Sequence, residues 1–127
     1  KNKNSYFFKY LGKQKYFSII KNFDCVIGNS SSGISEVPSL KIPTINIGTR
    51  QKGRIMAPSV INIKRLSIKS LDNAIKKIET IKFNKALLKS KNPYYKNNTT
   101  KNIIKILERV KFENINYKKF VDLKLKR

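Results

Sequence analysis

The chain has 127 residues, enough for one domain with a single core, and no apolar run near the roughly 18 residues of a membrane-spanning helix. One cysteine and no histidine exclude an internal disulfide and a zinc site of the Cys/His kind, and we expect a cytoplasmic protein without a bound metal. The net charge of +22 comes from lysines scattered over every segment, so we interpret it as solvated surface charge and compositional drift.

Near the amino end, the aromatic run Tyr6–Phe8 predicts a short strand. Apolar residues then recur at helical spacing, which predicts an amphipathic helix over Lys13–Asn22. The apolar run Cys25–Gly28 predicts a short buried strand, with the Cys25 thiol in the core. The polar stretch after it predicts a turn that opens into a short helix with a serine as its N-cap, and Pro38 limits that helix.

The second half of the chain continues with strands and helices. We expect strands over Pro43–Gly48 and Ser59–Ile63, with a loop between them. Two later apolar patterns have helical spacing, which predicts one helix capped by Ser70 and a last helix capped near Thr99. A polar linker precedes the last helix, and Glu113–Arg127 reads as a loosely attached basic tail.

The order of these elements is β-α-β-α-β-loop-β-α-α. Strands that alternate with helices predict an α/β fold with a parallel sheet covered by helices on both faces. The predicted strands are continuous apolar runs, as burial on both faces requires.

The serine loop between Gly28 and Gly33 follows the first buried strand of this sheet. Ligands of open parallel sheets bind beyond the carboxyl ends of the strands, and the start of a helix favours an anion. Ser30, Ser31 and Ser32 add hydroxyl donors, and Gly33 lets the backbone approach a ligand. The loop matches neither GxxxxGK[ST] nor GxGxxG. It predicts a phosphate site without a lysine, and the alternative is a plain helix cap with spare serines.

Three charged residues lie near this loop. Glu36 is one turn into the helix, about 4–5 Å along its axis, where a carboxylate can accept both hydroxyls of a ribose. Arg50 and Arg54 follow the next strand, so a guanidinium there can reach a diphosphate. The alternative is a solvated glutamate and surface arginines.

The segment from Val26 to Arg54, VIGNSSSGISEVPSLKIPTINIGTRQKGR, resembles the nucleotide-binding segment of the hydrolysing UDP-N-acetylglucosamine 2-epimerases of the sialic-acid-pathway type. The pattern of that family is close to GNSSxGxxE, an apolar stretch with a proline, and N-[IL]-G-x-R-Q-x-G-R. The resemblance covers the chain from about Tyr6 to Leu107. The matching positions are Gly28, Asn29, Ser30, Ser31, Gly33, Glu36, Pro43, Asn46, Gly48, Arg50, Gln51, Gly53 and Arg54.

The resemblance implies two Rossmann-like domains arranged as in type-B glycosyltransferases, with the sugar nucleotide between them. This chain resembles most of the second domain. We therefore expect a nucleotide-binding domain over 1–112, incomplete at its N-terminal side, and a tail over 113–127. A missing N-terminal domain would be its partner, and we expect a homo-oligomer at full length.

The resemblance also implies roles for single residues. Ser30 and Ser31 would bind the diphosphate, and Glu36 would bind the ribose. Arg50 would support the nucleotide from the next loop. Leu11 would contact the uracil through its backbone.

The implied reaction converts UDP-N-acetylglucosamine and water to N-acetylmannosamine and UDP, by anti elimination and hydration, with no cofactor. Related enzymes act on UDP-linked diacetamido sugars. The acid–base carboxylates of the family belong to its first domain, and its histidine is absent here. We therefore expect no catalytic residue in this chain and no activity of the chain alone. A second departure is NPYYKN over Asn92–Asn97 where the family has NPYGDG.

Two other classes stay open. One is a truncated remnant that at most binds UDP. The other, more distant, is a basic domain associated with nucleic acid, although the aromatic and basic residues show no stacking pattern.

Overall fold

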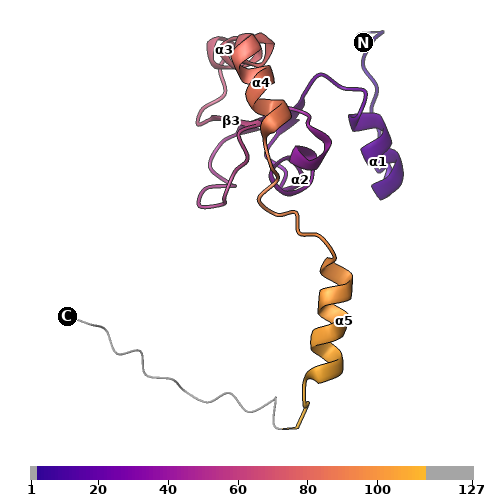
Figure 1. The fold of residues 1–127 in the computed structure, drawn as a ribbon. Helices are drawn as coiled ribbons and strands as arrows, with labels where there is room; N and C mark the ends of the chain where they lie inside the picture. Colours follow the sequence, from indigo (N-terminus) through magenta and orange to yellow (C-terminus); the bar gives the residue numbers. More distant parts are fainter. Residues whose placement is uncertain (1–2, 114–127) are drawn as a thin grey trace, which may run out of the picture. The chain divides into compact units, whose positions relative to one another are not determined.

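The computed structural model describes residues 3–113 (Figure 1). The chain divides into two compact units, Lys1–Tyr95 and Lys96–Arg127, and the predicted domain over 1–112 stays a prediction. Apart from Glu113, the predicted tail lies outside the described residues. Within residues 3–113, no helix combines the length and the hydropathy needed to cross a membrane.

The first unit is built on a sheet of three parallel strands in the order β1-β2-β3. Its strands are β1 (Val26–Gly28), β2 (Thr44–Ile47) and β3 (Val60–Ile63). The predicted parallel α/β fold is therefore confirmed, and each strand lies within its predicted range. One row of the sheet aligns Gly28, Asn46 and Asn62.

The predicted strand at Tyr6–Phe8 is wrong. These residues have no regular secondary structure, and their exposed fractions are 82%, 92% and 57%. Aromatic residues favour strands because they pack on a pleated, half-buried surface. No strand of residues 3–113 pairs with this segment, so its aromatic side chains have no sheet surface to pack on.

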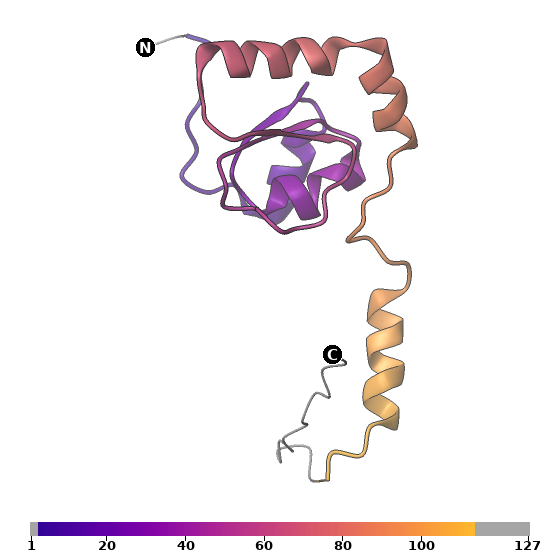
Figure 2. The ribbon, with the colours of Figure 1, turned by 90° about the vertical axis from the view of Figure 1, so that its left-hand side faces the viewer.

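The two faces of β2 pack against different helices (Figure 2). Ile45 joins Ala74 of helix α3 (Ile68–Glu79) in the core cluster, with Ile47 packed against it. Successive residues of a strand point to opposite faces, so Thr44 faces the other way and packs against Gly33 of helix α2 (Ser32–Ser35). The prediction of helices on both faces is confirmed.

Two short helical segments follow β1. Helix α2 has four residues with Ser31 as its N-cap, and the Ser31 side chain makes no capping hydrogen bond. A 3-10 turn, η1 (Val37–Leu40), follows with Pro38 near its start. Proline has no N–H to donate and is tolerated in a first turn. Helix α2 ends at Ser35, before Pro38, so the helix is short on the side where Pro38 was predicted to limit it.

Helix α1 spans Gly12–Ile20 and ends two residues before the predicted Asn22. Its Ile20 is buried. The Cys25 thiol is only partly buried, against the edge of the core, and not enclosed as predicted. Cys25 precedes the edge strand β1, which has a neighbour on one side only.

The helix predicted after Ser70 begins earlier. Ser67 is the N-cap of α3, and Ser70 lies three residues later as the second member of a capping box. The Ser67 hydroxyl accepts from the Ser70 N–H at 3.1 Å, and the Ser70 hydroxyl accepts from the Ser67 N–H at 2.9 Å. Two backbone donors of the first turn are thereby satisfied.

Helix α4 (Ile81–Lys89) was not predicted from the sequence. It follows α3 directly because Thr80 ends α3 and caps α4 in an extended conformation. Only Phe83 and Leu87 of α4 are buried. Two buried positions make a helical apolar pattern too weak to predict the helix.

The second unit contains helix α5, Thr99–Arg109, which begins where the last helix was predicted to be capped. Its N-cap is Asn98, at a positive φ of 57° and without a side-chain capping bond. No residue of α5 is buried.

Candidate functional site

The serine loop leaves the carboxyl end of β1 and is bonded to the loop that follows β2. Gln51, only 3% exposed, donates from Nε2 to the backbone oxygen of Asn29 at 2.8 Å. Gln51 lies within the sequence motif QKGR, and this bond explains why an amide is useful there. Ser30 and Ser31 remain exposed at this edge of the sheet.

The hydroxyl groups of the loop differ in their partners. The Ser30 hydroxyl accepts from the Ser32 N–H at 3.3 Å, and the Ser35 hydroxyl donates to the Ser31 backbone oxygen at 2.9 Å. Among the described residues, nothing hydrogen-bonds to the Ser31 hydroxyl itself. With four residues, α2 has little dipole, so an anion here would depend on hydroxyl and N–H donors.

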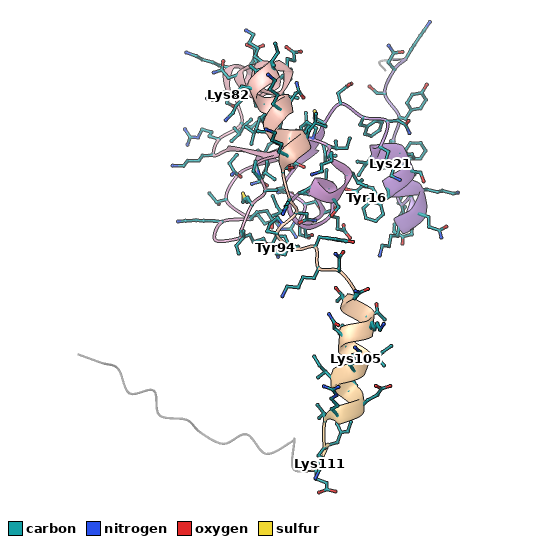
Figure 3. The ribbon with its side chains drawn as sticks, viewed as in Figure 1. Tyr16, Lys21, Lys82, Tyr94, Lys105 and Lys111 are labelled. Carbon is teal, nitrogen blue, oxygen red and sulfur yellow. The ribbon has the colours of Figure 1, made fainter. Side chains whose placement is uncertain are left out.

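Tyr16 connects α1 to this loop. Its phenol hydroxyl and the Ser32 hydroxyl are 2.9 Å apart, so the Tyr16 side chain reaches from α1 to the start of α2 (Figure 3). The sequence placed Tyr16 only within the predicted amphipathic helix over Lys13–Asn22. No local pattern predicts a bond between residues so far apart in the chain.

Glu36 lies at the junction of α2 and η1, with its side chain exposed. It lines a pocket of about 570 Å³ together with the segment from Phe8 to Phe17. That segment includes Leu11 and Tyr16, so the structure brings Leu11 and Glu36 to one pocket. No ion pair involves Glu36 within residues 3–113, and its carboxylate oxygens are available to a ligand.

Arg50 and Arg54 are exposed in the loop after β2. They lie beyond the same sheet edge as the serine loop, but neither lines the Glu36 pocket. A role for Arg50 in supporting a nucleotide stays a prediction. Within residues 3–113, no three His, Cys, Asp or Glu side chains are grouped to bind a metal ion.

Lysines occur in many separate segments of residues 3–113. Those labelled in Figure 3 are examples: Lys21 follows α1, Lys82 lies in α4, Lys105 lies in α5 and Lys111 follows α5. This distribution agrees with solvated surface charge.

Asn92 lies beside Glu36 and was not singled out as a candidate site residue from the sequence. It lines a second pocket beside Glu36, also of about 570 Å³. Its side-chain amide donates to the backbone oxygen of Ser35, the residue that precedes Glu36, at 2.8 Å. The only signal in the sequence was the NPYYKN segment, which departs from the NPYGDG of the family that the chain resembles.

Comparison with known proteins gives a consistent result. A sequence model of the family described as UDP-N-acetylglucosamine 2-epimerase matches residues 1–108. The polysialic acid biosynthesis protein P7 of Escherichia coli is 41% identical over 122 residues, which cover 93% of this chain and 31% of that protein. The GDP/UDP-N,N'-diacetylbacillosamine 2-epimerase (hydrolyzing) of Campylobacter jejuni is 45% identical over 117 residues, which cover 91% of this chain and 30% of that protein.

A shorter match, 43% identical over 49 residues, covers 38% of this chain and 13% of the UDP-N-acetylglucosamine 2-epimerase of Neisseria meningitidis. The chain thus spans about a third of the length of the two longer-matching relatives. The family model covers far more than half of the chain, and the GNSSSG and NIGTRQKGR motifs lie within the matched residues. This chain belongs to the UDP-N-acetylglucosamine 2-epimerase family.

Proposed function

We propose that this chain is the UDP-binding part of a hydrolysing 2-epimerase that acts on a UDP-linked 2-acetamido sugar. The observation that supports this most is the pocket lined by Leu11 and Glu36. Glu36 follows α2 directly and lies five residues beyond Ser31, the last exposed serine of the loop. UDP has a base, a ribose and a diphosphate, and each part needs its own contact. Leu11, Glu36 and the serine loop would supply these three contacts.

In this proposal, each side chain meets one part of UDP. Glu36 accepts hydrogen bonds from the ribose hydroxyls, which suits an exposed carboxylate without an ion-pair partner. Ser30 and Ser31 donate to the diphosphate, with Ser32 and Gly33 as support. Leu11 faces the uracil with its backbone. Arg50 adds positive charge from the neighbouring loop.

The proposed reaction of the complete enzyme has two steps. A base removes the C2 proton while the C1–oxygen bond to UDP breaks, which leaves a 2-acetamidoglucal. Water then adds across the double bond and gives the free sugar with the opposite configuration at C2. Donors at the diphosphate stabilise the departing UDP. The base would come from the part of the enzyme outside this chain, which has no histidine.

The sugar is either N-acetylglucosamine or a diacetamido sugar. The second option is supported by the 45% identity to the relative whose name specifies diacetylbacillosamine. A UDP-release assay on the complete gene product, with both UDP-sugars as substrates, distinguishes the two options. If UDP is released from neither UDP-sugar although UDP still binds, the protein would be a remnant that only binds UDP.

A titration of UDP at moderate and high salt tests the nucleotide site directly. We expect saturable binding of UDP that changes little with salt. Binding to any polyanion with a steep salt dependence would instead support a nucleic-acid-associated domain.

A further inference from the structure

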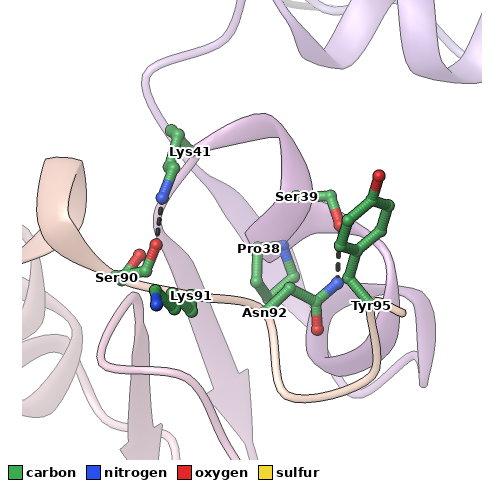
Figure 4. A pocket seen from close by; sticks show the side chains of 7 residues that line it. All are labelled: Pro38, Ser39, Lys41, Ser90, Lys91, Asn92 and Tyr95. Atoms are coloured by element: carbon green, nitrogen blue, oxygen red, sulfur yellow. Dashed lines mark hydrogen bonds between the residues drawn. The ribbon is translucent and has the colours of Figure 1, made fainter. Parts of the chain in front are cut away.

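Asn92 connects two segments that are far apart in the sequence. Its Nδ2 atom donates to the Ser35 backbone oxygen at 2.8 Å and to the Ser39 hydroxyl at 2.6 Å. Its Oδ1 atom accepts from the Tyr94 N–H at 2.9 Å. Figure 4 shows the Asn92 amide directed at Ser39, with Tyr95 beside it. Both hydrogens of the amide group and its oxygen are therefore in use.

These two contacts flank Glu36. Ser35 is the last residue of α2, and Ser39 lies within η1. The Glu36 N–H donates to the Ser32 backbone oxygen at 2.9 Å, and the Glu36 backbone oxygen accepts from the Ser39 N–H at 3.0 Å. The last carbonyls of a helix have no partner within it. Asn92 supplies that partner for Ser35 and so fixes the backbone next to Glu36.

The segment that presents Asn92 is itself anchored. The Lys41 ammonium donates to the backbone oxygen of Ser90, at the C-terminal end of α4 (Figure 4). A cation at this end of a helix is favourable, and Ser90 is buried at 4% exposure. Lys41 directly follows η1. The anchor therefore joins the same two segments that Asn92 joins, which keeps the Asn92 amide in place.

We infer that Asn92 is a positioning residue of the nucleotide site, which orients Glu36 toward the ribose through the Ser35 carbonyl and the Ser39 hydroxyl. This inference rests on the proposed function, in which Glu36 binds the ribose. Asn92 and Glu36 line one pocket, but the amide of Asn92 is fully used by protein partners. It therefore acts through Glu36 and does not contact the nucleotide.

The test compares the affinities of UDP and 2′-deoxy-UDP for the complete gene product that contains this chain. Glu36 reads the ribose hydroxyls, so the wild type should prefer UDP over its deoxy analogue by about tenfold. Asn92→Ala should remove most of this preference, and Asn92→Asp should do the same, because it keeps the acceptor for Tyr94 but loses both donors. In a Glu36→Gln background, Asn92→Ala should have little further effect.

Asn84→Ala is the matched control. The Asn84 amide also donates to two backbone oxygens, those of Ile78 and Thr80, at 3.0 and 3.2 Å. It bridges α3 and α4, and we expect this variant to lose stability without losing the preference for UDP. Thermal unfolding of all variants checks that each is folded. If Asn92→Ala does not fold, the affinity comparison uses Asn92→Asp.

The possible outcomes separate the two hypotheses. The Asn92 variants could keep the preference for UDP, as Asn84→Ala should, or they could lower the affinities for UDP and 2′-deoxy-UDP equally. Either result overturns the positioning role of Asn92, while the ribose role of Glu36 stands. If the wild type shows no preference and Glu36→Gln binds UDP like the wild type, the ribose role itself is wrong, and the role of Asn92 is overturned with it.

Discussion

Gly33 and Thr44 lie so close together that a Cβ atom at position 33 would be 2.7 Å from the Thr44 Cγ2 atom. Thr44 is 2% exposed in the central strand β2, so its side chain is surrounded by other protein atoms. The second glycine of the GNSSSG motif thus lets α2 pack directly on the sheet. This contact places the serine loop at the carboxyl end of β1.

Gly33→Ala should destabilise the protein by roughly 1–3 kcal/mol, because the added methyl overpacks this contact. Urea unfolding measures the change. Thr44→Ser removes the Cγ2 atom, so the double variant should regain part of the loss. If Gly33→Ala alone is as stable as the wild type, the close packing of α2 on β2 is contradicted.

Glu36→Gln should weaken UDP binding by roughly 1–3 kcal/mol, since a charged acceptor of the ribose hydroxyls is lost. Unfolding should not change, because Glu36 is exposed and, within residues 3–113, unpaired. Calorimetry on the complete gene product gives the affinity. Glu79→Gln, at an exposed position of α3, is the control, and equal UDP affinities in the two variants would remove Glu36 from the site.

The sheet could be predicted from the sequence because its strands are short apolar runs bounded by turn residues. The failures have different causes. Tyr6–Phe8 has strand propensity but no neighbouring strand, and α4 shows only Phe83 and Leu87 on its buried side. Ser67 and Ser70 are both serines, so composition alone does not say which one is the cap.

Only the part of the candidate site that lies in one continuous motif could be predicted from the sequence. The residues of the continuous motif, such as Glu36 and the serines, could be named from the sequence, although their roles stay predictions. Tyr16 and Asn92 contact α2 from 16 and 57 positions away in the chain. Such contacts depend on how the segments pack, and no local pattern contains that information.

Ser31→Ala should weaken UDP binding more than uridine binding, because the Ser31 hydroxyl is proposed to donate to the diphosphate. Stability should stay the same, since the Ser31 side chain makes no capping bond in the structure. Ser67→Ala is the contrasting variant, with an expected loss of about 1 kcal/mol of stability from the α3 cap and unchanged UDP binding. Equal weakening of UDP and uridine by Ser31→Ala would mean that the loop does not bind phosphate.

The pKa of the Cys25 thiol is raised, first by partial burial and second by the Asp24 carboxylate, since both disfavour the thiolate. The folded state therefore binds this proton more tightly than the unfolded state. The resulting stability is present below the unfolded pKa and is lost as pH rises through the folded pKa. Alkylation of Cys25 by iodoacetamide should rise at a higher pH than for free cysteine, and Asp24→Asn should shift the profile to lower pH. An unchanged profile in Asp24→Asn would rule out the contribution of the carboxylate.

The 127-residue chain alone should have no epimerase activity and should bind UDP weakly. Elimination needs a base within hydrogen-bond reach of the C2 proton. The resemblance implies that the acid–base carboxylates belong to the first domain of the family, and the histidine of the family is absent from this chain. It also needs water excluded until the intermediate forms, whereas Ser30, Ser31 and Glu36 are exposed in this chain. A coupled assay for UDP release compares this chain with the complete gene product. Release by the complete product alone is the expected result, because its additional residues would supply the base and cover the serine loop. Turnover by the short chain would mean that the base lies among these residues, and the division of roles proposed for the enzyme would then be wrong.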